Sequence, residues 1–505
     1  MASFGTALPT SGTDENTIRA GLIRHIMLSG CDNVLVHAKG VQIQGAWITD
    51  VLDLQGCESP LDLALMHCHI CEQPNLLGAR LGSVMLPGCA VPGLDAHRLK
   101  VKRGLLLNKG FKASGAVDLS SVIIGGALEC SGGRFDGALN CDAMTVGADV
   151  FLIDGFAARG LVNLRGAQIS GNLQCSGAKF QGDLDYEGMT VGGGMFWQDA
   201  PKPLDVFDLT DAYVGALRDD VGSWKECIPV LNGFRYDRII SEMTVRERLD
   251  WLAEKFEMPI VAAVQIDGEP LPWLSKQGDE KFDPQPYSQL AATLRAQGNA
   301  SGAARVLVAR EERLRRMGYL RAQAGLGPKD AAAVWTSLLA MIKRPFDWAF
   351  GLVFGYGHQP ARALVLVTAI WAFCFALYGA AYDARQMAPN SDVVLTSEEW
   401  GEALKGCENV KMDGCEMPLH LWVGKGDLKP MPTSVDYETF SRGLYALDLF
   451  VPLDALGQEN AWAPSKDRGA LGWWAYYLRW AVQMSGWVIT AVAAAALTGV
   501  IGRKE

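Results

Sequence analysis

A cluster of cysteine and histidine residues has the types and spacing of a metal or redox site. His67, Cys68, His69 and Cys71 lie within five consecutive positions. In Cys-x-x-Cys spacing, two thiolates can hold a zinc ion or act together as a dithiol, and neighbouring imidazoles can complete the set of zinc ligands. The chemistry that these four residues offer is therefore metal binding or thiol redox chemistry.

A structural interpretation competes for the same cysteines. Cys57 and Cys89 each follow a glycine, and Cys68 lies 11 residues after Cys57. In later units of a repeat described below, alanine follows glycine at the same position, so a thiol here can serve as a small apolar side chain in a tight inward corner. Only Cys71 falls outside this pattern. We therefore predict no metal site and keep the four residues as alternative candidate ligands.

Other signals of electron-transfer chemistry are missing from the sequence. It has no G-x-G-x-x-G between a strand and a helix, no C-x-x-C-H and only seven histidines. We predict no catalytic residue and no bound cofactor. The sequence favours a protein without enzymatic activity and leaves that question open.

A second candidate site lies near the C-terminus. An apolar half-helix is expected over residues 444–456, and it is followed by a Gly-Gln-Glu turn and then by a long apolar segment. This is the order of elements in a two-helix pore-loop channel, in which Asp448, Asp454, Gln458 and Glu459 would line a cation pore between several chains. The alternative is an amphipathic helix that lies at a membrane interface.

Cys407 and Cys415 form a candidate disulfide. They are eight residues apart, in a segment that we place outside the membrane below. An oxidising compartment would allow this disulfide, whereas the nine cysteines before residue 363 would stay reduced on the cytosolic side.

The composition limits the class of protein. The chain has 505 residues, a net charge of −10, 49% hydrophobic residues and 20% charged residues. The apolar content excludes disorder of the whole chain, and the acidic balance argues against a nucleic-acid partner. The irregular spacing of the twelve cysteines excludes a small disulfide-linked fold.

An internal repeat predicts the fold that must position the first candidate site. The 45 residues from Leu105 and the 45 from Val150 align without a gap and are identical at 20 positions, and each copy has a finer period near 11. One unit of 11 is a short alternating strand and a small-residue corner, and it cannot bury its apolar face alone. Two units make a coil of about 22 residues. We therefore predict a right-handed, pentapeptide-repeat-like β-solenoid over residues 36–215, with the leucines of each unit pointing inward.

Helices are expected on both sides of this solenoid. Residues 1–35 contain an amphipathic helix that would cap the open first coil. Residues 216–282 form a mixed connecting region, and residues 283–326 have the pattern of a tetratricopeptide-like helical hairpin. Residues 327–362 are expected to be juxtamembrane interfacial helices.

Two long apolar segments predict transmembrane helices, at residues 363–382 and 473–502, because about 20 apolar residues in a helix cross a bilayer. Residues 305–344 carry nine Lys and Arg against three acids, whereas the loop 383–472 carries eight basic and fifteen acidic residues. By the positive-inside rule, both termini, including the tail 503–505, are cytosolic and the loop is outside.

The chain resembles a bacterial family. The sequence GGALECSGGRF and its neighbours, the segment FDPQPYSQLAATLRAQG, and LDALGQENAW before a Gly-Trp helix are similar to pentapeptide-repeat-like solenoid membrane proteins, often catalogued as "membrane-associated oxidoreductase". The resemblance covers most of the chain. It implies a solenoid attached to the bacterial inner membrane and, by the family's label, redox activity.

Three functional hypotheses follow. In the first, a multi-pass inner-membrane protein carries a cytosolic solenoid that binds a protein partner or acts as a scaffold, without catalysis. In the second, the chain forms a homo-oligomeric pore-loop ion channel. In the third, it is a membrane redox enzyme. The expected partners are the lipid bilayer and a protein on the solenoid.

Overall fold

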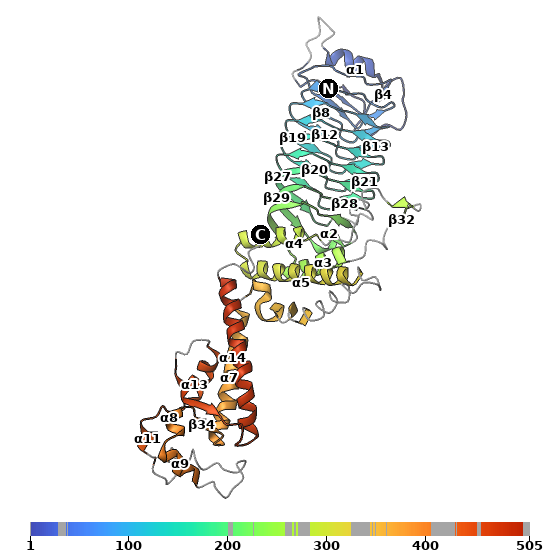
Figure 1. Cartoon of the computed structure of the whole chain (residues 1–505). Coiled ribbons are helices and arrows are strands. Elements are labelled where there is room, and N and C mark those ends of the chain that lie inside the picture. The colour runs from blue at the N-terminus through green and yellow to red at the C-terminus, as the bar shows by residue number, and fades with distance from the viewer. Residues whose placement is uncertain are drawn as a thin grey trace. The chain divides into compact units, whose positions relative to one another are not determined.

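The computed structural model describes residues 2–28, 37, 39–199, 206–225, 227–257, 265–266, 269–270, 283–324, 344–345, 347–348, 350–359, 361–405, 430, 432–451 and 456–497. The chain divides into two compact units, Met1–Gly318 and Tyr319–Glu505. Each unit is treated by itself, and Figure 1 labels their helices and strands.

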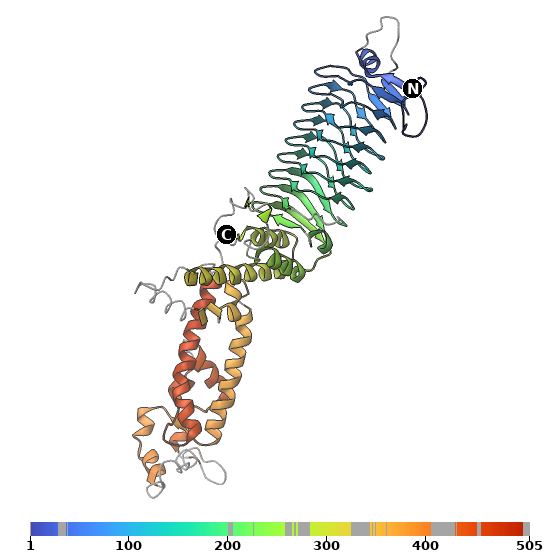
Figure 2. The same ribbon diagram turned by 90° about the vertical axis from the view of Figure 1, so that its right-hand side faces the viewer.

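The first unit is a β-solenoid of parallel strands (Figure 2). On one face, successive coils place ten residues in register, in nine steps of 21 to 23 residues. These residues are Val41, Leu63, Val84, Leu105, Leu128, Val150, Leu173, Met195, Leu217 and Ile239. The predicted β-solenoid with a coil of about 22 residues is confirmed.

Most coils have four faces, each built from a short strand. The first face contains β3 (Val41–Gln44), β5 (Leu63–Met66), β8 (Val84–Met85), β12 (Leu105–Leu106), β16 (Leu128–Glu129), β20 (Val150–Phe151), β24 (Leu173–Gln174), β27 (Thr190–Trp197), β29 (Tyr213–Asp219) and β31 (Arg235–Ser241), and β1 (Ala2–Ser3) pairs with β3. The second face contains β2 (Thr17–Arg19), β4 (Trp47–Thr49), β6 (His69–Ile70), β9 (Ala90–Val91), β13 (Lys112–Ala113), β17 (Arg134–Phe135), β21 (Ala157–Ala158) and β25 (Lys179–Phe180). The third face contains β10 (Leu94–Asp95), β14 (Val117–Asp118), β18 (Leu139–Asn140), β22 (Val162–Asn163), β26 (Leu184–Asp185), β28 (Val206–Asp208) and β30 (Ile228–Val230). The fourth face contains β7 (Arg80–Leu81), β11 (Lys100–Val101), β15 (Ile123–Ile124), β19 (Thr145–Val146) and β23 (Gln168–Ile169), and it joins the first face at β27.

Inward side chains of successive coils stack to form the core. The inward leucines that the repeat predicts, such as Leu128 and Leu173, are at most 1% exposed. On the second face, Phe111, Phe135 and Phe156 form a column with ring centroids 5.4 to 5.6 Å apart. Because each coil adds its rings to those of its neighbours, the core is continuous along the stack.

A recurring turn bends the chain after the third face. Eight successive coils carry Asp or Asn there, and each side-chain oxygen accepts the backbone N–H two residues later. We call this column the Asx ladder: Asp53, Asn75, Asp95, Asp118, Asn140, Asn163, Asp185 and Asp208. Three positions later the backbone is left-handed, for example at Gly166 with φ of +62°, which explains a glycine of the repeat.

The ends of the solenoid differ from the sequence prediction. Helix α1 (Ala20–Met27) buries Ala20, Ile23 and Met27 in the first unit's core, but residues 17–19 before it form β2 rather than helix. The coils also continue past residue 215, because β29, β30 and β31 add to the stack. Helices α2 (Val221–Trp224), α3 (Val245–Glu257), α4 (Gln285–Ala296) and α5 (Ala300–Ala324) follow, with a short pair of strands, β32 (Gln265–Ile266) and β33 (Glu269–Pro270).

The second unit is built on two long helices, α7 (Arg362–Asp383) and α14 (Ala470–Leu497). Helix α12 (Arg442–Phe450) packs against both of them. Smaller elements are η3 (Gly355–Gly357), α8 (Asp392–Leu395), α9 (Glu398–Lys405), α11 (Pro432–Val435), α13 (Gln458–Ala461), and the antiparallel pair β34 (Met387–Pro389) and β35 (Trp462–Pro464).

Helix α7 is long and apolar enough to cross a membrane, with a mean hydropathy of 2.1, and it is the one such helix in the part of the chain that the structure describes. The predicted second span falls mainly on α14, which does not meet the same criterion over its described residues. Two transmembrane helices therefore stay a prediction.

Two neighbouring isoleucines test the register of the solenoid. Ile124 is 1% exposed and Ile123 is 43% exposed, on the same strand. We expect Ile124→Ala to cost about 2–5 kcal/mol, because it leaves a cavity in the core. The matched control, Ile123→Ala, should change stability by less than about 1 kcal/mol. Urea unfolding of both variants of the full chain checks this, and equal losses would show that the assigned faces are wrong.

Candidate functional site

The four candidate metal ligands do not converge. Cys68 is fully buried, and its thiol donates to the carbonyl oxygen of Met66 at 3.3 Å. His69 is on the outer side of the solenoid, where its ring stacks on Trp47 with centroids 4.0 Å apart. Strand alternation therefore points Cys68 and His69 in opposite directions.

The other two candidate ligands are His67 and Cys71. His67 occupies a left-handed corner with φ of +50°. Partial burial, with Glu72 nearby, raises the pKa of the Cys71 thiol and disfavours the thiolate that zinc or redox chemistry requires. Within the described residues, no three His, Cys, Asp or Glu side chains are grouped as metal ligands would be.

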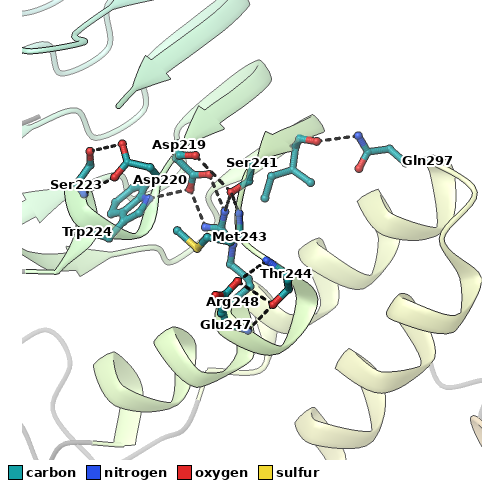
Figure 3. Close-up of polar contacts among 11 residues, drawn as sticks. Asp219, Asp220, Ser223, Trp224, Ser241, Met243, Thr244, Glu247, Arg248 and Gln297 are labelled. Carbon is teal, nitrogen blue, oxygen red and sulfur yellow. Dashed lines mark hydrogen bonds and ion pairs between the residues drawn. The ribbon is translucent and has the colours of Figure 1, made fainter. Parts of the chain in front are cut away.

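A buried ion pair closes the C-terminal end of the solenoid (Figure 3). Two nitrogens of Arg248 donate to the Asp219 carboxylate at 2.6 and 2.7 Å, and both side chains are almost fully buried. The indole N–H of Trp224 donates to the same carboxylate at 2.7 Å, and Ser241 Oγ accepts from Arg248 at 3.0 Å. All of these groups partner one another, so the charges are stabilised without a ligand.

Helix caps hold both sides of this ion pair in place. Thr244 and Glu247 exchange hydrogen bonds at the start of α3, as in a capping box, and those from Thr244 lower the pKa of Glu247. Asp220 caps α2 by accepting the N–H of Ser223 at 2.8 Å. The cap geometry fixes Arg248 on α3 opposite Asp219 on β29.

A small cavity lies beside the ion pair. It has a volume of about 20 Å³, and its lining includes Tyr236, Arg248, Trp251 and Leu290. A space of this size holds about one water molecule. The polar groups at this end of the solenoid partner one another, so they have a structural role.

Helix α4 covers the edge of the last first-face strand, β31. Its polar side chains bond to carbonyl oxygens of residues 234–239 at 2.6 to 3.1 Å. They recur at steps of four along the helix and at its C-cap: Gln285, Gln289, Thr293 and Gln297. These bonds block further strand pairing at the edge, so the predicted helical hairpin packs on the solenoid.

Two of the four candidate pore residues are buried within one chain. Asp448 is 3% exposed, and its carboxylate accepts the backbone N–H groups of Leu456 at 3.2 Å and Glu459 at 2.8 Å. Gln458 is 2% exposed, accepts the N–H of Ser441 at 2.9 Å and donates to Glu438 at 2.7 Å.

The third candidate, Glu459, faces α14. Its carboxylate pairs with Arg479 at 3.5 Å and accepts a hydrogen bond from Gln483. These three residues thus connect α12, α13 and α14. The sequence prediction missed Arg479, although a lone charge in an apolar helix is a signal for such a partner. The fourth candidate, Asp454, and the candidate disulfide of Cys407 and Cys415 lie outside the described residues.

The long helices of the second unit expose large apolar side chains. On α7, Leu364 is 67% and Val365 is 73% exposed. On α14, exposed aromatic and apolar side chains extend from Trp473 to Val488. Side chains of this kind normally lie in a core, a protein interface or lipid.

Comparison with known proteins adds no assignment to these features. No protein-family model, curated protein or solved structure matches the chain.

Removing the arginine of the buried ion pair, which is on α3, should strongly lower the stability of the first unit. Arg248→Met leaves the buried Asp219 carboxylate without its cation, which should cost about 3–5 kcal/mol. Arg246→Met is the matched control, because Arg246 is on the same helix in an exposed pair with Asp250. Hydrogen exchange of the full chain should rise across β29 and β31 only in the Arg248 variant. Equal exchange in both variants would contradict a structural role for the pair.

Proposed function

We propose that this protein is an integral protein of the bacterial inner membrane, and that it carries a cytosolic β-solenoid as a protein-binding or scaffolding module without catalytic activity. The redox activity implied by the family resemblance and the ion-channel hypothesis both stay predictions. The proposal has two parts, membrane insertion and partner binding, which are supported by different observations.

The exposed apolar surface of α7 carries the proposal. Only 22% of its most apolar window is buried, although its mean hydropathy is 2.1. A core helix of similar composition would bury most of that surface, so lipid is the solvent that fits. Exposed Trp473, Trp474 and Tyr477 at the start of α14 support a second span with an aromatic belt.

The distribution of charged residues on the two sides of α7 supports the proposed orientation, with the solenoid in the cytosol. The nine Lys and Arg of residues 305–344 precede α7, and acids outnumber bases by fifteen to eight in residues 383–472. Basic residues are retained on the cytosolic side, so the solenoid would face the cytosol.

The outer surface of the solenoid supports a binding role. Lys112, Arg134 and Lys179 are exposed at register positions on the second face. The Asx ladder lies on the adjacent third face and includes five aspartates. Opposite charges at a regular spacing on a rigid surface favour recognition of a protein partner over several coils.

If α7 spans the membrane, a charged residue introduced into it should weaken its insertion. Val365→Arg should weaken insertion by less than the roughly 2.5–3.5 kcal/mol that arginine costs at a helix centre, because Val365 is in the first turn of α7. The control Val393→Arg changes an 80% exposed valine on α8, outside the predicted span. The wild type and the control should resist extraction by alkaline carbonate, with more of the Val365 variant extracted. Full extraction of the wild type would refute membrane insertion.

Partner binding predicts position-specific cross-linking in cells. A photoreactive amino acid at Lys112, Arg134 or Lys179 should capture the same partner, because the three positions lie on one face. The same probe at Val393, on the predicted outer side, should not capture it. Absence of a common product from these three positions would contradict a partner on this face of the solenoid.

A further inference from the structure

Two cysteines, Cys68 and Cys89, lie at the same position of successive coils. They are 21 residues apart, and each directly precedes a strand of the second face, β6 or β9, which pair in parallel. Equivalent residues of neighbouring parallel strands are about 4.8 Å apart, and the Cα atoms of a disulfide are roughly 4.4–6.8 Å apart. The stacking of the coils therefore holds these two residues at a separation that suits a disulfide.

The side chains of the two cysteines are in contact. The Cys89 sulfur accepts the backbone N–H of Cys68 at 3.4 Å, and the Cys89 thiol donates to the carbonyl oxygen of Leu65 at 3.1 Å. Leu65 is in the coil of Cys68, so the Cys89 thiol reaches back into the preceding coil. The two thiols also hydrogen-bond to each other. The sulfur atoms can therefore meet through side-chain rotation, without a change in the register of the coils.

The surroundings of Cys68 favour its thiolate. A hydrogen bond from the Cys89 thiol and the backbone N–H groups of Ala46 and Gly45 lower the pKa of Cys68, although burial opposes this. Burial raises the pKa of Cys89, so its thiol keeps the proton that it donates. The reactive form of cysteine is the thiolate, and a redox-sensitive cysteine often has a second thiol beside it. Cys68 and Cys89 thus fit the attacking and the resolving positions.

The partner that the C-x-x-C spacing suggests is out of reach. Cys71 follows Cys68 by three residues of extended chain through β6, which is about 10 Å. This exceeds the separation that a disulfide can bridge. The second thiol for Cys68 therefore comes from the next coil and not from its own.

We propose that Cys68 and Cys89 form a redox-sensitive pair, which a peroxide converts to a disulfide across two coils. The Cys68 thiolate attacks one oxygen of hydrogen peroxide, which gives a sulfenic acid and a hydroxide that takes up the proton lost by Cys68. The Cys89 sulfur then attacks the Cys68 sulfur, and the hydroxyl group leaves as water with the proton of Cys89. Two thiols and one peroxide thus give one disulfide and two waters, and the two electrons from the sulfurs reduce the O–O bond.

The position of the pair sets which oxidant can reach it. Both cysteines are fully buried, so the oxidant must be small and uncharged, as hydrogen peroxide is. The pair lies one residue inside an outer corner, where His67 is half-buried and its ring lies against Gly88. Local opening of this corner admits the peroxide. Cytosolic thiols would keep the pair reduced at other times, so the disulfide would form in response to oxidation.

Peptide mapping of the full chain in mild detergent tests this pair. Tryptic cleavage puts Cys68 in the peptide 40–80 and leaves Cys89 as the single cysteine of the peptide 81–98. The protein is treated with hydrogen peroxide, quenched with catalase and alkylated in denaturant before digestion. Mass spectrometry should then find the two peptides joined, with fragment ions that assign the bond to Cys68 and Cys89. Dithiothreitol should separate them.

Two alanine variants check the assignment of the bond. Cys68→Ala should abolish the joined peptide, and it should fold, because Ala46 holds the same position in the first coil. The matched control Cys71→Ala should give the joined peptide at the yield of the wild type. A wild-type Cys89 that stays fully alkylated after peroxide treatment would overturn the pair. A wild-type bond from Cys89 to Cys57 or Cys71 would also overturn it, and neither of these results depends on the folding of a variant.

Discussion

The solenoid depends on one constraint, which is that a coil of about 22 residues cannot bury its inward face alone. Each coil is stable only because the next one repeats its register, with parallel pairing and stacked inward side chains. The repeat therefore specifies size as well as polarity at each position. This explains why cysteine and alanine occupy the same inward corner position in different coils, so that cysteines there resemble metal ligands in the sequence. Cys68 and Cys89 lie inside for the same reason as the inward leucines.

The same stacking leaves open ends and an edge strand, and the rest of the first unit closes them. Helix α1 covers the first coil, and α3 and α4 cover the last. At the last coil the closure is polar as well as apolar, because the free carbonyl groups of β31 must be paired. Gln289 and its neighbours on α4 pair them, while Asp219 and Arg248 fix α3 in place.

These features differ in how far the sequence alone could predict them. The coil length and the inward leucines follow from periodicity, which is a local property of the chain. The last two coils were missed, because their strands are longer and their residues no longer repeat. Asp219 and Arg248 are 29 residues apart with no recurring partner, so nothing in the pattern pairs them. At residues 444–459 the sequence shows the order of elements and leaves a pore loop and an interfacial helix as alternatives. The bonds within the chain cannot be predicted, because Arg479 and the backbone N–H groups that these acids contact become neighbours only in the folded unit.

Both units pair backbone polar groups within the chain. In the solenoid, outward polar groups such as the Asx ladder bond to their own turn and have water around them. In the second unit, the backbone N–H groups of Leu456 and Glu459 have their bonding partner within the chain. Asp448 accepts both of these N–H groups and Gln458 accepts that of Ser441, so these two buried polar side chains have a structural role. A conducting path that used Asp448 or Gln458 would have to replace the bonds that these side chains make to the backbone.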